Sequence, residues 1–137
     1  MEKTLILYPA IGMMILTLFL YGKNYLDNRK ATLNKSINFS YFKTYIGEVP
    51  EYVTVSRQTL KNQFELPIFF YFLTSLVIAF DNVSQLDLIL AWIFTVIRYL
   101  HCFIRLSSNY VPYRALFFKL GMLVLTIWWI TFLYSVL

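Results

Sequence analysis

The sequence has little cysteine, no internal repeat and no low-complexity tract. Its single cysteine, Cys102, excludes an internal disulfide and any CxxC redox or zinc motif. The sequence places no base beside this thiol, so a small apolar side chain packed on a helix fits it better than a catalytic residue. The sequence therefore predicts one domain, residues 1–137, without a metal site.

Charged residues are also scarce, at 14% of the chain, because most of it is apolar. Hydrophobic residues make up 59% and aromatic residues 20%, more than a soluble domain of this size needs. Continuous apolar runs favour helices over the alternating strands of a membrane barrel, and a bilayer core of about 30 Å takes roughly 20 helical residues. We therefore predict an all-α, integral membrane four-helix bundle. The spans are expected at about 4–22, 58–80, 86–106 and 115–137, with a connecting loop at about 23–57.

The first apolar block, residues 4–22, carries no charge and is longer than the core of about 7 to 15 residues of a cleaved signal peptide. No A-x-A-like cleavage site precedes Lys23. We expect this block to remain in the protein as a helix. The loop that follows is too long for a tight turn, so part of it is expected to be helical or to lie on the membrane surface.

Charge placement predicts which side of the membrane each connection faces. The segment 23–61 carries seven basic and three acidic residues, whereas the turn between the second and third spans carries only Asp81 and Asp87. By the positive-inside rule, the first and third connections are cytoplasmic and both termini lie outside; in a bacterium the membrane would be the inner membrane. These juxtamembrane positions account for the net charge of +5, which points to a lipid bilayer as partner and not to nucleic acid.

Two of the predicted spans carry polar residues at helical spacing. Arg98, His101 and Arg105 fall on one face of the third span, and Asn62 and Glu65 fall on one face of the second. An ionisable group inside a membrane costs on the order of 2.5 to 3.5 kcal/mol, so it persists when it is paired, faces water or reaches the interface. We expect the two stripes to meet near the cytoplasmic boundary, in a pocket with excess positive charge. Such a pocket suits a small anion that carries carboxylates and an amine.

A structural role for these charges is the alternative. Glu65 would then pair with Arg98, and the pair would neutralise two buried charges and hold the bundle together. The sequence leaves both interpretations open.

Two segments resemble signatures of the MAPEG family, the membrane-associated proteins of eicosanoid and glutathione metabolism. Residues 62–70, NQFELPIFF, are similar to its second-helix signature, in which an Asn is followed three residues later by a Glu and then by a Pro. Arg98 and His101, followed by PYRAL at 112–116, resemble the R-x-x-H and P-x-R-A-L elements of its microsomal glutathione transferases. The microsomal prostaglandin E synthases share part of this pattern. With four apolar spans in agreement, the resemblance covers essentially the whole chain.

The resemblance implies a homotrimer of four-helix subunits, with glutathione bound between neighbouring subunits near the cytoplasmic face. It implies a catalytic role for Arg114, because a guanidinium near a thiol lowers the pKa of the thiol and favours the nucleophilic thiolate. A lipophilic co-substrate would reach this thiolate from the lipid. The glutathione-binding residues that it implies are Asn62, Glu65, Arg98, His101 and Arg105.

The chain departs from the family pattern at three positions. Pro67 follows the glutamate by two residues instead of three, and Gln58 stands where the family has a basic residue four positions before the asparagine. Arg105 replaces a tyrosine four residues after the histidine, which changes the charge of the pocket. Two further residues, Arg57 and Tyr110, are secondary candidates for contacts with glutathione.

Two functions stay open at this point. The first is a glutathione-dependent transferase or peroxidase that acts on lipophilic electrophiles or lipid hydroperoxides. The second is a non-catalytic lipid-binding or scaffolding protein of the same family. Arg114 favours the enzyme, because a scaffold has no need of a group that stabilises a thiolate. A third function, a transporter with a proton relay through His101 and Glu65, is disfavoured because no broken helix and no inverted repeat is expected.

Overall fold

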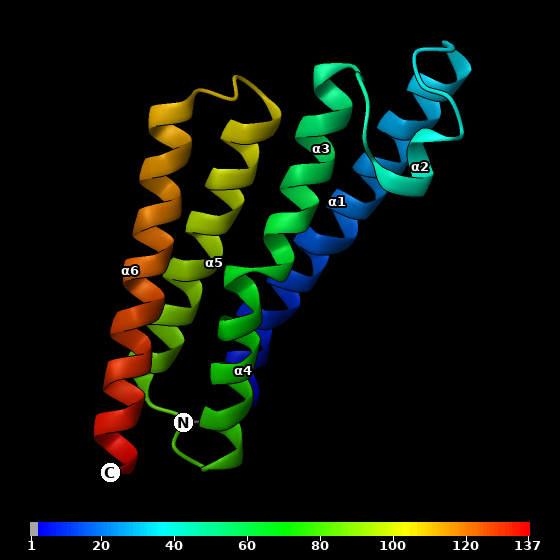
Figure 1. Cartoon of the computed structure of the whole chain (residues 1–137). Helices are drawn as coiled ribbons and strands as arrows, with labels where there is room; N and C mark the ends of the chain where they lie inside the picture. The colour runs from blue at the N-terminus through cyan, green and yellow to red at the C-terminus, as the bar shows by residue number, and fades with distance from the viewer. Residues whose placement is uncertain (1–2) are drawn as a thin grey trace.

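The computed structural model describes residues 3–137, and the regular elements in this part of the chain are all helices, without a strand (Figure 1). Helices α5 and α6 run antiparallel side by side, and α1 crosses behind α3 and α4. The first and third connections lie at one end of the bundle, and both ends of the chain lie at the other. The elements are η1 (Lys3–Ile6), α1 (Leu7–Leu33), α2 (Tyr41–Thr44), α3 (Glu51–Lys61), η2 (Asn62–Phe64), α4 (Leu66–Ala79), α5 (Gln85–Leu106) and α6 (Val111–Val136).

Four helical segments within residues 3–137 are long and apolar enough to cross a bilayer, which confirms the predicted all-α membrane bundle. Even the shortest, with 22 residues, reaches roughly 33 Å at the helical rise of about 1.5 Å per residue. The segments are Thr4–Leu33, Glu51–Ala79, Gln85–Leu106 and Val111–Val136.

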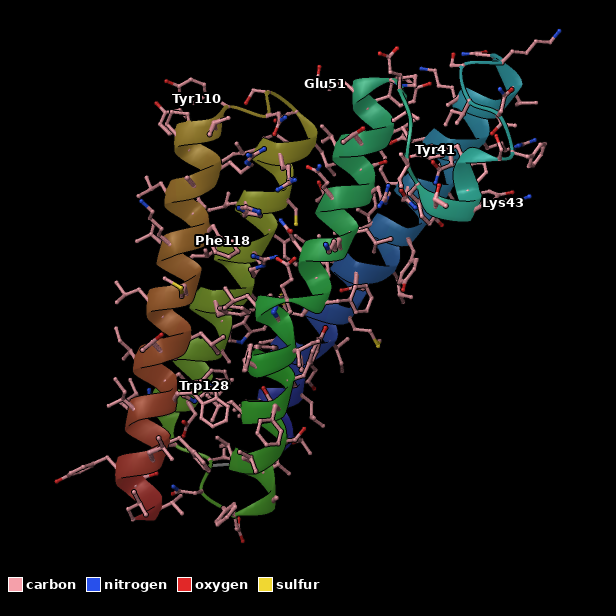
Figure 2. All side chains as sticks on the ribbon, in the orientation of Figure 1. Tyr41, Lys43, Glu51, Tyr110, Phe118 and Trp128 are labelled. Carbon is pink, nitrogen blue, oxygen red and sulfur yellow. The ribbon has the colours of Figure 1, made fainter. Side chains whose placement is uncertain are left out.

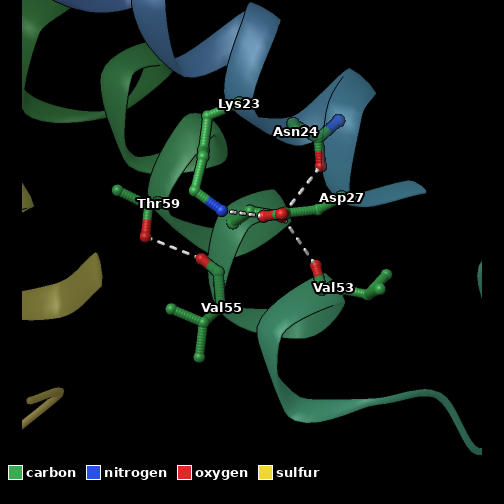
Figure 3. A network of polar contacts seen from close by, with 7 residues as sticks. Lys23, Asn24, Asp27, Val53, Val55 and Thr59 are labelled. Carbon is green, nitrogen blue, oxygen red and sulfur yellow. Dashed lines mark hydrogen bonds and ion pairs between the residues drawn. The ribbon is translucent and has the colours of Figure 1, made fainter. Parts of the chain in front are cut away.

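The first connection is shorter than the loop expected at 23–57. Helix α1 continues past Gly22 to Leu33, and α3 begins at Glu51. One polar contact within α1 and one between α1 and α3 lie at these helix ends (Figure 3). Lys23 pairs with Asp27 one turn later in α1, and Ser56 Oγ of α3 lies 3.4 Å from Asn24 Oδ1 of α1. The polar flank therefore extends the helix, because its charges satisfy one another along the helix surface.

Residues between α1 and α3 are partly helical, in agreement with one of the two forms expected. The short helix α2 packs through Tyr41, which is 7% exposed, against α1 and α3. Arg57 of α3 holds this segment, because its Nη1 donates to Tyr41 Oη and to the main-chain oxygen of Tyr45, both at 3.3 Å. Its guanidinium also lies over the Tyr45 ring, 4.2 Å from the ring centre.

The second span is broken in the middle, although no broken helix was expected from the sequence. Helix α3 ends at Lys61, η2 is a single 3-10 turn, and Glu65 has φ −103° and ψ −96°, outside the helical region. Pro67 supplies the physical reason. Proline has no N–H to donate, and its ring would clash with the carbonyl four residues earlier, that of Gln63. The chain accordingly starts a new helix, α4, at Leu66.

The core lies between α4, α5 and α6, in the half of the bundle nearer the chain ends. Phe70 stacks on Phe94, with ring centres 4.9 Å apart, and contacts Trp128 edge-on at 5.7 Å. Trp128 is fully buried and points from α6 into the bundle (Figure 2). Its Nε1 donates to Asp87 Oδ1 at 2.7 Å, while Asp87 and Ser84 form a capping box at the start of α5. The registration of α5 on α6 therefore rests on apolar packing and on one buried carboxylate that is fully hydrogen-bonded.

Candidate functional site

Three polar side chains of α5 are buried in the half of the bundle that contains the α5–α6 turn. Arg98, His101 and Arg105 are 0%, 2% and 8% exposed. The face of α5 that carries them contacts α6 and α3. Two guanidinium groups are thus withdrawn from solvent, which is costly unless other groups satisfy their charge and their N–H donors.

Arg98 contacts the break in the second span. Its Nη2 donates to the main-chain oxygen of Asn62 at 3.1 Å. Its Nε and Nη1 are buried without a hydrogen-bond partner in the described part of the chain. A carbonyl at the C-terminal end of a helix carries partial negative charge, so it compensates the guanidinium in part. Two of the three guanidinium nitrogens of Arg98 thus have no hydrogen-bond partner among the described residues.

Arg105 bridges Asn62 and Gln58. Its Nη2 donates to Gln58 Oε1 at 2.6 Å. The Asn62 amide, oriented from its hydrogen-bond partners, accepts from Arg105 Nη1 at 3.0 Å. The Nε of Arg105 is buried without a partner in residues 3–137. Asn62 therefore joins both arginines, Arg98 through its main chain and Arg105 through its side chain.

Glu65 lies beside this cluster but is exposed, because the backbone leaves the helical path at that residue. Its Oε2 is 3.3 Å from the nitrogen of the Asn62 amide. Among residues 3–137 no ion pair joins Glu65 to Arg98 or Arg105. Glu65 and Arg98 thus form no direct ion pair, although the Glu65 carboxylate lies close enough for its charge to attract Arg98 and Arg105.

Arg114 lies in the first turn of α6 and is held at both ends. Its main-chain oxygen is 3.0 Å from His101 Nδ1, and its main-chain nitrogen donates to the oxygen of Tyr110 at 3.0 Å. Its Nη1 donates to Asn109 Oδ1 at 2.7 Å. Pro112 lies in the first turn of α6, where the missing N–H costs nothing, so α6 can begin here. This start places Arg114 against α5.

The contact with Arg114 also fixes the tautomer of His101. A carbonyl oxygen only accepts, so Nδ1 must carry the proton that it donates. The other ring nitrogen, Nε2, is buried and has no partner in residues 3–137. The imidazole packs on Phe118 of α6, which points into the bundle (Figure 2), with ring centres 5.9 Å apart. His101 therefore links the main chain of Arg114 to α5, and its Nε2 has no hydrogen-bond partner among the described residues.

The two secondary candidates face elsewhere. Arg57 is turned toward α2 and stacks on Tyr45, as described above. Tyr110 is 52% exposed at the outer end of α6 (Figure 2), and its ring contacts Tyr113 with ring centres 5.0 Å apart. The six main candidates form two sets of contacts along one face of α5. The first set contains Asn62, Glu65, Arg98 and Arg105, and the second contains His101 and Arg114.

Three residues of the site were not predicted from sequence. Gln58 lies one helical turn before Asn62, so the spacing alone places it on the same face. Asn109 contacts Arg114 across a turn, for which no periodic signal exists. Gln63 lies within the break and is 2% exposed; its Nε2 donates to Cys102 Sγ at 3.2 Å, while its Oε1 has no partner in the described part of the chain. Cys102 is thus a buried, hydrogen-bonded thiol.

Two apolar grooves flank α1. The groove between α1 and α4 has a volume of about 690 Å³, and the groove between α1 and α5 has a volume of about 540 Å³. Gln63 lines the first and Cys102 lines the second, so both grooves reach the level of the helix break. Within residues 3–137, no three His, Cys, Asp or Glu side chains converge as they would around a metal ion.

Comparison with known proteins assigns the chain to a family. A family model described as the MAPEG family matches residues 6–134, which is nearly the whole chain. Comparisons with curated proteins and with solved structures gave no significant match. The match spans all four helical segments and both halves of the polar site, and it confirms the resemblance seen in the sequence. The chain therefore belongs to the MAPEG family.

Proposed function

We propose that the chain is a glutathione-dependent transferase or peroxidase that acts on lipophilic electrophiles or lipid hydroperoxides within the membrane. Membership of the MAPEG family indicates a membrane function in glutathione or eicosanoid metabolism. The proposal goes further, to a thiol bound at the helix break and a thiolate stabilised by Arg114. One observation carries it: two buried guanidinium groups have N–H donors without hydrogen-bond partners and form no ion pair with a carboxylate in residues 3–137.

The donors present fit glutathione. A guanidinium binds a carboxylate through two parallel hydrogen bonds, and glutathione carries two carboxylates. Arg98 has two nitrogens to offer and Arg105 has one, on groups already joined through Asn62. The exposed Glu65 carboxylate beside Asn62 suits the amine of the same ligand. We assign Asn62, Glu65, Arg98 and Arg105 to binding of the peptide.

The same face of α5 leads to Arg114 through His101. The hydrogen-bond acceptor of the Arg114 guanidinium is a neutral amide, so its positive charge is uncompensated by the described residues. We assign Arg114 the stabilisation of the thiolate. Bound glutathione would supply the nucleophilic sulfur; in the peroxidase form, two thiols become a disulfide while the hydroperoxide becomes an alcohol and water. His101 holds the main chain of Arg114, so we place it at the site as a group that positions the catalytic arginine.

The proposal includes the assembly and topology expected from the sequence. A single domain of residues 1–137 would form a homotrimer in the bilayer, with both termini outside and the first and third connections cytoplasmic. The helix break lies near the middle of the bundle, and Arg114, in the first turn of α6, lies toward the end that carries the first and third connections. The thiol would then bind from the cytoplasm, and the lipophilic substrate would arrive from the lipid.

A second candidate function is lipid binding without catalysis. The two apolar grooves beside α1, of about 690 and 540 Å³, favour it because they have room for the acyl chain of a lipid. The two functions differ in one property. Only the enzyme requires that glutathione binds with its thiol ionised near neutral pH.

The test is a pH titration of glutathione bound to the purified protein in detergent. Ultraviolet absorbance of the thiolate is recorded for the wild type, for Arg114→Ala and for Lys119→Ala, which removes an exposed cation five residues further along α6. We expect a thiolate signal near neutral pH in the wild type and in Lys119→Ala, and its loss in Arg114→Ala. A folded wild-type protein that binds lipid but neither binds glutathione nor ionises it would refute the enzyme and favour the scaffold.

A further inference from the structure

The α5–α6 turn contains a contact that the turn itself does not require. Asn109 has φ +50°, in the left-handed region that asparagine tolerates better than most residues. Its main-chain nitrogen donates to the oxygen of Ile104 at 2.8 Å, which closes the C-terminal end of α5. These features explain an asparagine through its backbone alone. The side chain nevertheless extends to Arg114 and accepts from Nη1 at 2.7 Å.

This contact determines where the charge of Arg114 is held. The main chain of Arg114 is held by the contacts with His101 and Tyr110, so only the flexible side chain stays free to move. An arginine side chain loses rotamer entropy when it is fixed. One short hydrogen bond from Asn109 fixes the terminal group at a defined position. A preorganised charge stabilises a developing or bound anion better than a mobile one does.

The chemistry of the acceptor matters as much as its position. In the described part of the chain, the groups that face Arg114 are the Asn109 amide from the turn, the His101 imidazole and the Arg105 guanidinium from α5, and the main chain of Tyr110; the Arg105 charge repels that of Arg114. None of them is an acid, and no Asp or Glu among residues 3–137 forms an ion pair with Arg114. An aspartate in place of Asn109 would hold the guanidinium equally well but would neutralise it.

We propose that Asn109 is a positioning residue that fixes the Arg114 guanidinium through a neutral acceptor and so leaves its charge available to the bound thiolate. The inference rests on the proposed function, because it concerns the same thiol. It adds a requirement that the sequence motif does not contain: the arginine must be oriented by a group without charge.

Two variants separate position from charge, and a third serves as control. Asn109→Asp keeps the shape and the left-handed backbone but adds a carboxylate. Asn109→Gly removes the side chain at a φ value that glycine adopts readily. Ser108→Ala changes the neighbouring turn residue, whose hydroxyl accepts from the Tyr110 main chain at 3.4 Å and does not contact Arg114. Each variant is purified as the full chain in detergent and saturated with glutathione.

The measurement is the pKa of the bound thiol from thiolate absorbance, together with the Kd of glutathione. We expect Asn109→Asp to raise the pKa of the thiol by about 1 to 2, which is the interaction of two like charges about 6 to 10 Å apart at an effective dielectric constant of about 20. Asn109→Gly should raise it by about 0.5 to 1, the equivalent of one lost hydrogen bond. Ser108→Ala should match the wild type.

The outcomes distinguish this inference from the function on which it rests. Equal thiol pKa values in the wild type, Asn109→Asp and Asn109→Gly, all with glutathione bound, would overturn the role of Asn109 and leave the enzyme intact. A wild-type protein whose bound thiol titrates like free glutathione would overturn both. If Asn109→Asp does not fold, Asn109→Gly decides, because a purely structural residue would change stability without moving the pKa of the ligand.

Discussion

Replacement of Arg98 by methionine is expected to stabilise the ligand-free protein and to weaken its binding of glutathione. Arg98 is fully buried, and within residues 3–137 only Nη2 of its three side-chain nitrogens has a hydrogen-bond partner. Methionine has a similar length and no charge, so it fills the same space. The two effects have opposite signs because of the same unsatisfied donors. Without glutathione they lower the free energy of unfolding, and with glutathione present they form hydrogen bonds to it.

The magnitudes follow from the hydrogen bonds that are made and left unmade. Two buried nitrogens without partners cost about 1 to 3 kcal/mol each, and Arg98→Met removes that cost. The variant loses one charge-assisted bond, to the main-chain oxygen of Asn62, worth about 1.5 to 3 kcal/mol. The ligand-free variant should therefore be more stable by about 1 to 3 kcal/mol. The Kd of glutathione should rise roughly 10- to 100-fold, through the loss of bonds between a guanidinium and a carboxylate.

The assay is reversible unfolding in sodium dodecyl sulfate, with and without glutathione, and calorimetric titration of the ligand. Wild-type protein at a ligand concentration of 100 times Kd should gain about 2.7 kcal/mol, whereas Arg98→Met should gain much less at the same concentration. Arg29→Met is the matched control, because Arg29 is exposed on α1. It should change stability by no more than about 0.5 kcal/mol.

A destabilised Arg98→Met protein with unchanged affinity for glutathione would refute the reasoning. Arg98 would then be a structural residue whose contact with the main chain of Asn62 outweighs its unsatisfied donors. A variant that is both destabilised and unable to bind would point to general loss of the fold, which far-ultraviolet circular dichroism would reveal.

Three further predictions concern other parts of the molecule. Trp128→Phe leaves Asp87 Oδ1 without its indole donor and should lower the free energy of unfolding by about 1.5 to 3 kcal/mol, measured in detergent, with no change in the Kd of glutathione. Pro67→Ala should let the helix continue through the carbonyl of Gln63, which would increase the helical signal slightly and weaken glutathione binding, measured by circular dichroism and titration. Arg57→Ala should cost about 1 kcal/mol of stability by freeing α2 but leave glutathione affinity unchanged; a large loss of affinity would return Arg57 to the binding site.

Much of the fold was predictable because a bilayer imposes long apolar segments and internal backbone pairing. The spacing of Arg98, His101 and Arg105 also placed them correctly on one buried face, since helical geometry depends on sequence separation alone. The helix class and the family followed from the same local patterns. Prediction of these features does not require the contacts between residues of different helices.

The rest depends on contacts between distant residues. The sequence shows Lys23 as the end of an apolar block, and the contact of Ser56 in α3 with Asn24 shows that α1 continues beyond this point beside α3. Pro67 signals a kink, but the exposed position of Glu65 follows from the path that the backbone takes after the break. Asn109 contacts Arg114 across a left-handed turn, a geometry that neither spacing nor composition encodes.

Arg98 donates its hydrogen bond to the main-chain oxygen of residue 62, and this limits which substitutions can disturb Arg98 in related sequences. A peptide oxygen is present whatever side chain follows it, so exchange of Asn62 would leave Arg98 anchored and release only Arg105. A combinatorial library varied at 62 and 105 could therefore shift which anion is preferred while the anchor persists. Changes of thiol preference among related sequences should accordingly accumulate at these two positions, with Arg98 invariant between them.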